Sequence, residues 1–248
     1  MKLSIITAVY NREHTIAAAL ASLHAQTHPD IEHIVIDGGS TDNTLAILRA
    51  SLPAGACLVS EPDHGIYDAL NKGLARASGD AIGILHSDDM LADANVLADV
   101  AATFASTHAD AVYGDLDYVA NDDSGRIIRH WRAGPYNRAR LRRGWMPPHP
   151  ALFVRRHVIE QHGGYNTKLR IAADYDAILR WFGTGHISAA WLPRVLVRMR
   201  TGGVSNRSLT HILTKTREDL HALRTNRIGG LSTLAWKNLS KLPQFVRR

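Results

Sequence analysis

The chain contains the run Asp80-Ala81-Ile82-Gly83-Ile84-Leu85-His86-Ser87-Asp88-Asp89, in which a short apolar segment ends in two adjacent carboxylates. A continuous apolar run of this length, bounded by polar residues, is typical of a buried strand. Ligands of open α/β sheets bind beyond the carboxyl ends of the strands, so Asp88 and Asp89 are expected at the mouth of a binding site. Their hard oxygen atoms suit Mg²⁺ or Mn²⁺, commonly shared with phosphate groups. The alternative is a turn in which one of the two caps a helix expected over 95–105.

The chain before this run alternates between predicted strands and helices. Apolar and β-branched residues predict strands over 3–9, 31–36 and 56–60, and apolar residues at helical spacing predict helices over 15–25 and 45–50. This alternation is typical of βαβ units around a parallel sheet. We therefore expect an α/β fold, with a central, mostly parallel mixed sheet flanked by helices.

Length and composition limit the classes of protein to which the chain can belong. Its 248 residues, 45% of them hydrophobic, suffice for one large domain or for one domain with a C-terminal appendage. The single cysteine, Cys57, excludes a disulfide framework and a cysteine-based zinc site, and fits a reducing compartment. The net charge of +6 favours an anionic partner. No apolar run reaches transmembrane length, so we expect a cytoplasmic protein, soluble or bound peripherally to the inner face of the membrane.

A third carboxylate, Asp37, closes the second predicted strand and precedes Gly38 and Gly39. Glycines let the backbone turn tightly and approach a ligand, but Asp-Gly is also a common turn dipeptide, so a structural role is the alternative. Further along, a polar turn opens a predicted helix that carries Asn71 and Lys72. These two side chains either contact a phosphate or ribose near the strand ends, or are solvated.

Four segments together make a specific resemblance. They are Ile5-Ile6-Thr7-Ala8-Val9-Tyr10-Asn11, Val35-Ile36-Asp37-Gly38-Gly39-Ser40-Thr41-Asp42-Asn43-Thr44, Asp63-His64-Gly65-Ile66-Tyr67-Asp68-Ala69-Leu70-Asn71-Lys72-Gly73 and Ser87-Asp88-Asp89. In this order they resemble the family 2 glycosyltransferases with the GT-A fold, in particular the small bacterial enzymes that assemble polysaccharides and glycolipids. The resemblance covers residues 3–205 in outline and is strongest over 3–90.

The resemblance implies a domain organisation and a reaction. Residues 1–206 would form the GT-A domain, with a nucleotide-sugar half over 1–115 and an acceptor half over 116–206, and residues 207–248 would form a C-terminal helical appendage. The enzyme would move a sugar from a nucleotide-diphosphate donor to a hydroxyl of a glycan or lipid-linked acceptor. A single displacement would invert the configuration at the anomeric carbon.

For the donor base, the resemblance implies contacts with Thr7 and Tyr10 at the end of the first strand. Asp37 would accept a hydrogen bond from the base, typically from uracil N3–H, which favours a UDP-sugar. Asp63 and Asn71 fall in the stretch that lines the donor site.

For the diphosphate, Asp88 would hold the ribose and Asp89 would ligate the Mn²⁺ or Mg²⁺ that bridges the phosphates. A metal at this place neutralises the charge that develops on the leaving group. His86 stands where a strict Asp-x-Asp motif has its first acid, so the chain carries a Ser-Asp-Asp variant. Arg198 or Arg200, just before a Gly-Gly-Val-Ser loop, would assist in neutralising the diphosphate.

On the acceptor side, the resemblance assigns an Asp-Tyr-Asp segment to the catalytic base. Asp174 would remove the proton of the attacking hydroxyl, with Asp176 as the fallback. Without the resemblance, Asp174 would be interpreted as the N-cap of a helix whose Ile178 and Trp181 face inward. His149 would lie on the acceptor side of the cleft, and a structural histidine under a proline-rich turn is the alternative.

Two parts of the chain are candidates for membrane contact. Aromatic residues are interleaved with seven arginines: Arg126, Arg129, Arg132, Arg138, Arg140, Arg142 and Arg143. Arginine suits phosphate, so this segment contacts an anionic acceptor or a membrane, or is a solvated loop; nucleic acid is not expected. Apolar stripes predict two further helices, over 209–223 and 231–245, separated by Gly229-Gly230. With Lys237 on or near its polar side, the second helix either lies in a membrane interface or packs on the domain or on another subunit.

Other features narrow the function. Asp115 and Asp117 lie near a turn and are expected to be solvated, and the alternative is that they face the site. A catalytically silent module that binds a nucleotide-sugar or a glycan is the alternative to an enzyme, and a homo-oligomer is compatible with either. A dinucleotide-dependent oxidoreductase is disfavoured, because Tyr10-Asn11-Arg12 follows the first strand in place of a Gly-x-Gly-x-x-Gly turn.

Overall fold

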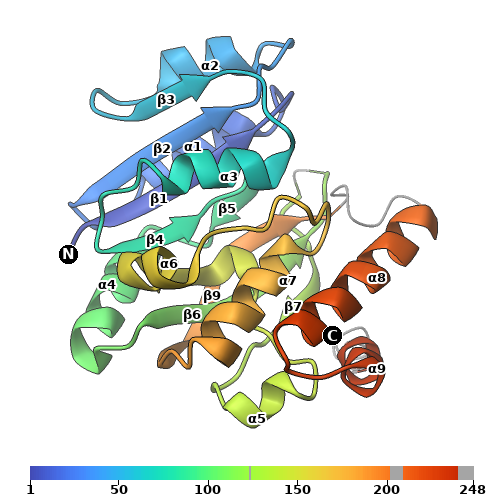
Figure 1. Ribbon diagram of the computed structural model, residues 1–248. Coiled ribbons are helices and arrows are strands. Elements are labelled where there is room, and N and C mark those ends of the chain that lie inside the picture. Colours follow the sequence, from blue (N-terminus) through green and yellow to red (C-terminus); the bar gives the residue numbers. More distant parts are fainter. Residues whose placement is uncertain (123, 202–208, 240–248) are drawn as a thin grey trace.

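The computed structural model describes residues 1–122, 124–201 and 209–239 (Figure 1). In its first part strands alternate with helices: β1 (Leu3–Val9), α1 (Ile16–His24), β2 (Ile31–Asp37), α2 (Thr44–Ser51), β3 (Cys57–Ser60), α3 (Ile66–Leu74) and β4 (Ala81–Ile84). These four strands pair in parallel in the order β3-β2-β1-β4. The predicted βαβ units are therefore confirmed, with strand β1 at the predicted bounds.

After β4, the chain no longer alternates regularly between strands and helices. Its elements are β5 (Asp89–Leu91), α4 (Val96–Thr107), β6 (Ala111–Val119), β7 (Ile127–Trp131), α5 (Arg138–Leu141), the 3₁₀ turn η1 (His149–Ala151), β8 (Leu152–Arg155), α6 (Arg156–His162), α7 (Ala173–Ile178) with its π-helical continuation η2 (Leu179–Thr184), β9 (Ala189–Arg200), α8 (Leu209–Thr225) and α9 (Leu231–Leu239). The described strands form one nine-stranded sheet in the order β3-β2-β1-β4-β8-β6-β9-β5, with β7 paired to β6. Strand β8 runs antiparallel to β4 and β6, which makes the sheet mixed, as predicted.

Three elements differ from the prediction. Apolar runs over 187–192 and 195–199 predict two separate strands, but the structure has one continuous strand, β9, because it pairs along the length of β6. Part of the expected basic loop, residues 127–131, is strand β7. Strand β8 pairs only with the first residues of β6, so the other end of β6 is open to β7. Asp89 begins strand β5 and does not lie in a helix-capping turn.

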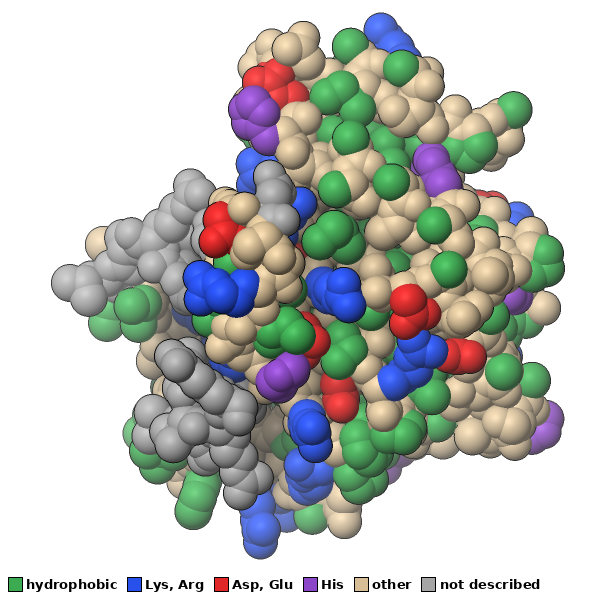
Figure 2. Space-filling model, turned by 180° about the vertical axis from the view of Figure 1, so that it is seen from behind, with side chains coloured by type: hydrophobic (Ala, Val, Ile, Leu, Met, Phe, Trp, Pro, Cys, Tyr) green, Lys and Arg blue, Asp and Glu red, His purple; other side chains and the backbone are tan. Residues whose placement is uncertain are grey.

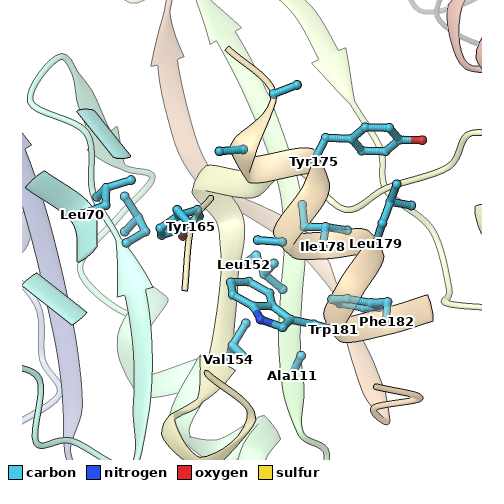
Figure 3. Close-up of a cluster of buried hydrophobic side chains, with 14 of the residues drawn as sticks. Leu70, Ala111, Leu152, Val154, Tyr165, Tyr175, Ile178, Leu179, Trp181 and Phe182 are labelled. Atoms are coloured by element: carbon cyan, nitrogen blue, oxygen red, sulfur yellow. The ribbon is translucent and has the colours of Figure 1, made fainter. Parts of the chain in front are cut away.

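An aromatic cluster joins the parallel strands to the second part of the fold (Figure 3). Ile178 and Trp181, on the helix formed by α7 and η2, are buried, as predicted. In Figure 3 they lie on the side of this helix that faces Leu152 of β8, and Tyr165 lies between the helix and Leu70 of α3. Replacing a buried tryptophan of this kind with alanine typically costs about 3–5 kcal/mol, so the cluster fixes α7 against the sheet.

The C-terminal helices pack against α7, the residues before it and the chain near Arg142. Helix α8 contacts both α7 and α9. The prediction that Lys237 lies on the polar side of α9 is wrong: Lys237 is buried, because its ammonium group pairs with Asp219 of α8 at 2.9 Å and lies over the ring of Tyr175. The part of the predicted stripe beyond residue 239 lies outside the described residues. No described helix combines the length and apolar character needed to span a bilayer.

Candidate active site

Asp89, the first residue of β5, has an unusual environment. It is 1% exposed, and neither of its carboxylate oxygens has a hydrogen-bond partner of regular geometry among the described residues. Burial raises the pKa of Asp89 well above its usual value, the charge of Asp88 raises it further, and the backbone N–H of Arg200 offsets part of this rise. A buried carboxylate without a regular partner costs stability, so it is typical of a functional position.

The carboxylates at this place fit a divalent metal that is shared with a substrate. Among the described residues, no group of three or more His, Cys, Asp or Glu side chains could enclose a metal ion. Mg²⁺ is commonly bound by one or two carboxylates together with substrate phosphates, and does not need a cage made only of protein. The unsatisfied oxygens of Asp89, with partly exposed Asp88 beside it, match that donor set.

A second cluster brings Asp174 to the same place. The carboxylates of Asp88 and Asp174 both act on the ring of His86: burial lowers the pKa of His86, and the two charges oppose this. Asp174 lies in the first turn of α7, whose N-cap is Ala172, so the N-cap interpretation of Asp174 is wrong. Tyr67 of α3 donates a hydrogen bond to the backbone carbonyl of Ile171, in the loop that precedes α7. Its hydroxyl lies 3.4 Å from Asp174 Oδ1.

His149 lies in this cluster as well. Its Nε2 is 2.9 Å from the hydroxyl of Tyr165, and its ring is 5.9 Å from that of His86. Burial lowers the pKa of His149 to about 4, so the ring is neutral at neutral pH. Sequence reasoning missed the contacts of His86, Tyr67 and Tyr165, because their positions along the chain gave no sign that α3, η1 and α7 meet.

Asp37 at the end of β2 orders a turn. It is fully buried, and its carboxylate accepts hydrogen bonds from the backbone and hydroxyl of Ser40 and from the hydroxyl of Ser60. Asp63 packs against Gly38, where any added Cβ would overlap the Asp63 carboxylate. Tyr10 is 54% exposed at the same edge of the sheet. Tyr10 and Asp63 therefore lie at the carboxyl ends of these strands, and Asp37 is buried beneath them.

Two predicted donor contacts have interior partners instead. Thr7 is buried, and its hydroxyl lies 3.1 Å from His33 Nε2, so its side chain does not border an open site. Asn71 uses both ends of its amide on the backbone of Tyr165, donating through Nδ2 and accepting at Oδ1, each at 2.8 Å. Asn71 is thus a link between α3 and the segment after α6.

The prediction that Asp115 and Asp117 are solvated is wrong, because both are buried in β6. Asp115 accepts hydrogen bonds from the indole of Trp191 at 3.0 Å and from the backbone of Ala133 at 2.9 Å. Asp117 pairs with His130 of β7 at 2.6 Å. These carboxylates fasten β7 and the chain after it to the sheet.

One arginine of the basic segment, on β7, packs on a tyrosine of β6. The guanidinium of Arg129 lies over the ring of Tyr118, 4.5 Å from its centroid. Burial raises the pKa of Tyr118, the charge of Arg129 lowers it, and the charge of Asp89 raises it. Arg200, predicted near the diphosphate, ends β9, and the loop expected after it, over 202–205, lies outside the described residues.

Comparison with solved structures defines the class. The structure of Staphylococcus aureus TarS 1–349 in complex with UDP has a TM-score of 0.66, at 21% identity over 100% of this chain and 71% of that chain. The mannosyltransferase PcManGT from Pyrobaculum calidifontis, in complex with GDP-Man and Mn²⁺, has a TM-score of 0.63, at 21% identity over 98% of this chain and 75% of that chain. The fold is that of the GT-A glycosyltransferases.

Sequence comparison gives the family. The model of glycosyl transferase family 2 matches residues 4–163. A PGL/p-HBAD biosynthesis glycosyltransferase of Mycobacterium bovis is 35% identical over 209 residues, which cover 82% of this chain and 78% of the relative. An uncharacterized glycosyltransferase of Mycobacterium tuberculosis is 36% identical over 185 residues, 71% of this chain and 67% of the relative. The chain belongs to glycosyl transferase family 2, as the sequence motifs predicted.

Proposed function

We propose that this glycosyltransferase transfers a sugar from a UDP-sugar to a hydroxyl group of a lipid-linked or growing glycan, with inversion at the anomeric carbon. One observation carries the proposal: the charges of Asp88 and Asp174, from distant parts of the chain, both act on the ring of His86, and Asp88 also acts on its neighbour Asp89. TarS, which shares the fold, is described in complexes with UDP and UDP-GlcNAc, which supports the choice of donor. The name of the mycobacterial relatives, PGL/p-HBAD biosynthesis glycosyltransferase, supports an acceptor of the glycolipid class.

At the donor end, the base lies against Tyr10 and Asp63, above the turn that Asp37 orders. Ser40 and Ser60 occupy both oxygens of the Asp37 carboxylate, so a hydrogen bond from uracil N3–H to Asp37 requires the Ser40 turn to open. Asp88 would hold the ribose and Asp89 would bind the metal.

The chemistry needs charge neutralisation on one side and a base on the other. A Mn²⁺ or Mg²⁺ ion, when bound, neutralises the negative charge that develops on the diphosphate. Asp174 takes the proton of the acceptor hydroxyl while the hydroxyl oxygen bonds to the anomeric carbon and the bond to the diphosphate breaks. His149, held neutral by burial, shapes the acceptor side without adding charge.

Thermal unfolding with a panel of nucleotides tests the donor site. UDP, GDP, CDP and dTDP are each added with Mn²⁺, with Mg²⁺ or with EDTA. We expect UDP with a metal to raise the melting temperature by roughly 5–11 °C at 100 times its Kd, since binding to the native state alone stabilises it by mass action. The same nucleotide with EDTA should give a much smaller shift. If no nucleotide shifts the melting temperature, or if the shift is independent of metal, the donor-site assignment is wrong.

We also propose that one surface contacts an anionic membrane. Helix α9 exposes the side chains of Leu231, Trp236 and Leu239, each by more than half. Exposed Arg142 and Arg143 adjoin it, because a hydroxyl of α9 donates to the backbone of Arg142 at 2.9 Å. Figure 2 shows basic side chains among hydrophobic ones over the centre and lower part of the face that lies behind in Figure 1. Aromatic and aliphatic groups beside arginines are typical of surfaces that lie at a lipid interface.

Sedimentation with vesicles tests this surface. We expect the protein to bind vesicles that contain phosphatidylglycerol, and the Trp236→Ser variant to bind them more weakly. Replacing Arg142 and Arg143 by glutamine should weaken binding by about 30-fold, at about 1 kcal/mol for each charge. The matched control is Ile128→Ser, an exposed apolar residue on β7 that is 48% accessible, which should bind as the wild type does. Failure of the wild type to bind, or a dimer in solution that buries α9, would contradict the proposal.

A further inference from the structure

Glu218 of α8 makes three hydrogen bonds to consecutive backbone groups. Its Oε1 accepts from the N–H of Arg170 at 2.9 Å, and its Oε2 accepts from the N–H groups of Ile171 and Ala172 at 2.8 and 2.9 Å. Hydrogen bonds to an ionised carboxylate are roughly twice as strong as those between neutral groups. One side chain of the C-terminal part therefore determines the backbone path over 170–172.

These three residues lead directly into the turn that carries Asp174. The first N–H groups of a helix lack partners within the helix, and the N-cap of α7, Ala172, has no polar side chain to accept from them. Glu218, 46 positions away, accepts from the N–H of Ala172 itself and so fixes the residue at which α7 begins. On the opposite side, Tyr67 donates to the carbonyl of Ile171 at 2.7 Å. The loop is therefore held from both sides, by α8 and by α3.

The C-terminal helices also hold the residues that follow Asp174. The ammonium group of Lys237 lies over the ring of Tyr175, and Asn226, the residue that follows α8, donates to Asp176 Oδ1 at 2.9 Å. Residues 170–172, 175 and 176 are thus each in contact with α8, α9 or the residue that follows α8. The match to the family model ends at residue 163, so this arrangement lies beyond the matched segment.

We propose that Glu218 is a positioning residue for sugar transfer, which sets the direction of the Asp174 carboxylate by fixing the backbone over 170–172. The proposal rests on the proposed function, in which Asp174 is the base. Glu218 does not touch the reacting atoms, so its removal should slow the chemical step and leave donor binding intact. A merely structural role of Glu218 would instead lower stability, donor binding and rate together.

The test compares Glu218→Gln with Lys215→Gln, a change on the same helix that removes an ion pair to Asp219 and leaves residues 170–172 untouched. Nucleotide release from UDP-sugars is followed with a panel of alkyl and aryl glycosides as acceptors, next to thermal unfolding with UDP and Mn²⁺. We expect Glu218→Gln to lower kcat at least tenfold, with the donor KM and the UDP-induced thermal shift within twofold of the wild type. Glu218→Asp, which keeps the charge, should recover part of the rate, and Lys215→Gln should keep all of it.

The outcomes separate this proposal from the one on which it rests. A kcat of Glu218→Gln within twofold of the wild type would overturn the positioning role, and so would a parallel fall in rate and donor binding in both glutamine variants. The Asp174→Asn variant is measured in the same assay. Full activity of that variant would refute the assignment of the base, whereas its loss beside an unchanged Glu218→Gln would refute only the positioning role.

Discussion

The Asp174→Asn variant is expected to transfer sugar about 10²- to 10⁴-fold more slowly than the wild type, the range that a positioned general base contributes. In the wild type, Asp174 Oδ1 accepts hydrogen bonds from the backbone N–H of Tyr175 at 2.8 Å and from the hydroxyl of Tyr67. Asparagine keeps the shape of the side chain and an oxygen that can accept both. Folding and donor binding should therefore be preserved. The measurement is kcat for nucleotide release, next to the thermal shift with UDP and Mn²⁺.

Asp176→Asn is the matched control. Asp176 is buried, forms an ion pair with Arg180 at 3.1 Å and accepts a hydrogen bond from Asn226 at 2.9 Å. Its replacement should therefore lower the free energy of unfolding more than the rate of sugar transfer. If Asp176→Asn loses transfer while Asp174→Asn retains it, the base is Asp176. A wild-type protein that binds UDP with a metal but transfers no sugar from any donor of the panel would instead support the silent binding module.

The Asp89→Asn variant is expected to lose the metal-dependent part of nucleotide binding and to transfer sugar roughly 10²-fold more slowly or worse, since a metal clamp supplies several kcal/mol. The same variant should be more stable than the wild type when metal is absent. Asp89 is buried without a regular partner and next to Asp88, so an uncharged amide removes an unfavourable charge. Thermal unfolding in EDTA should show a rise of about 2–4 °C for each kcal/mol gained.

The stability advantage of Asp89→Asn over the wild type should increase as the pH rises. Because the pKa of Asp89 is raised on folding, its contribution to stability is fully present below the unfolded value of about 4 and is lost as the pH rises through the native value. Asparagine does not titrate, so the advantage of the variant should be near zero at pH 4 and grow toward pH 8. Asp30→Asn, a change at an exposed turn residue, should show no such trend. An advantage that is constant with pH, or a destabilised variant, would refute this account of Asp89.

Local sequence predicts the first part of the fold well, and for a physical reason. Strand β1 has the predicted bounds, because its apolar run and its terminating residues lie within the element itself. Strand β7 was not predictable in this way. Its Ile127 and Ile128 are exposed, and only pairing with β6 makes the segment a strand.

In the candidate site as well, local sequence points to single residues but not to the contacts between distant segments. Motifs pointed to the carboxylates at strand and helix starts, Asp88, Asp89 and Asp174, and the charges of Asp88 and Asp174 both act on the ring of His86. The same motifs gave no sign that the side chains of Thr7 and Asn71 bond to interior partners, because the position of a residue near a strand end does not tell which way its side chain points. Contacts between segments far apart in the chain, such as that of Glu218 with residues 170–172, have no local signal at all.

The place of strand β5 limits how this enzyme can evolve. Strands β1 to β4 lie at one side of the sheet, but β5, which begins with Asp89, lies beyond β9 at the opposite edge. Asp89 is paired there with Met199, so a strand from the second part of the fold holds the residue that is proposed to bind the metal. A substitution in β9 that moves this strand would therefore also move Asp89. Changes in the two parts of the fold are coupled during evolution for this reason.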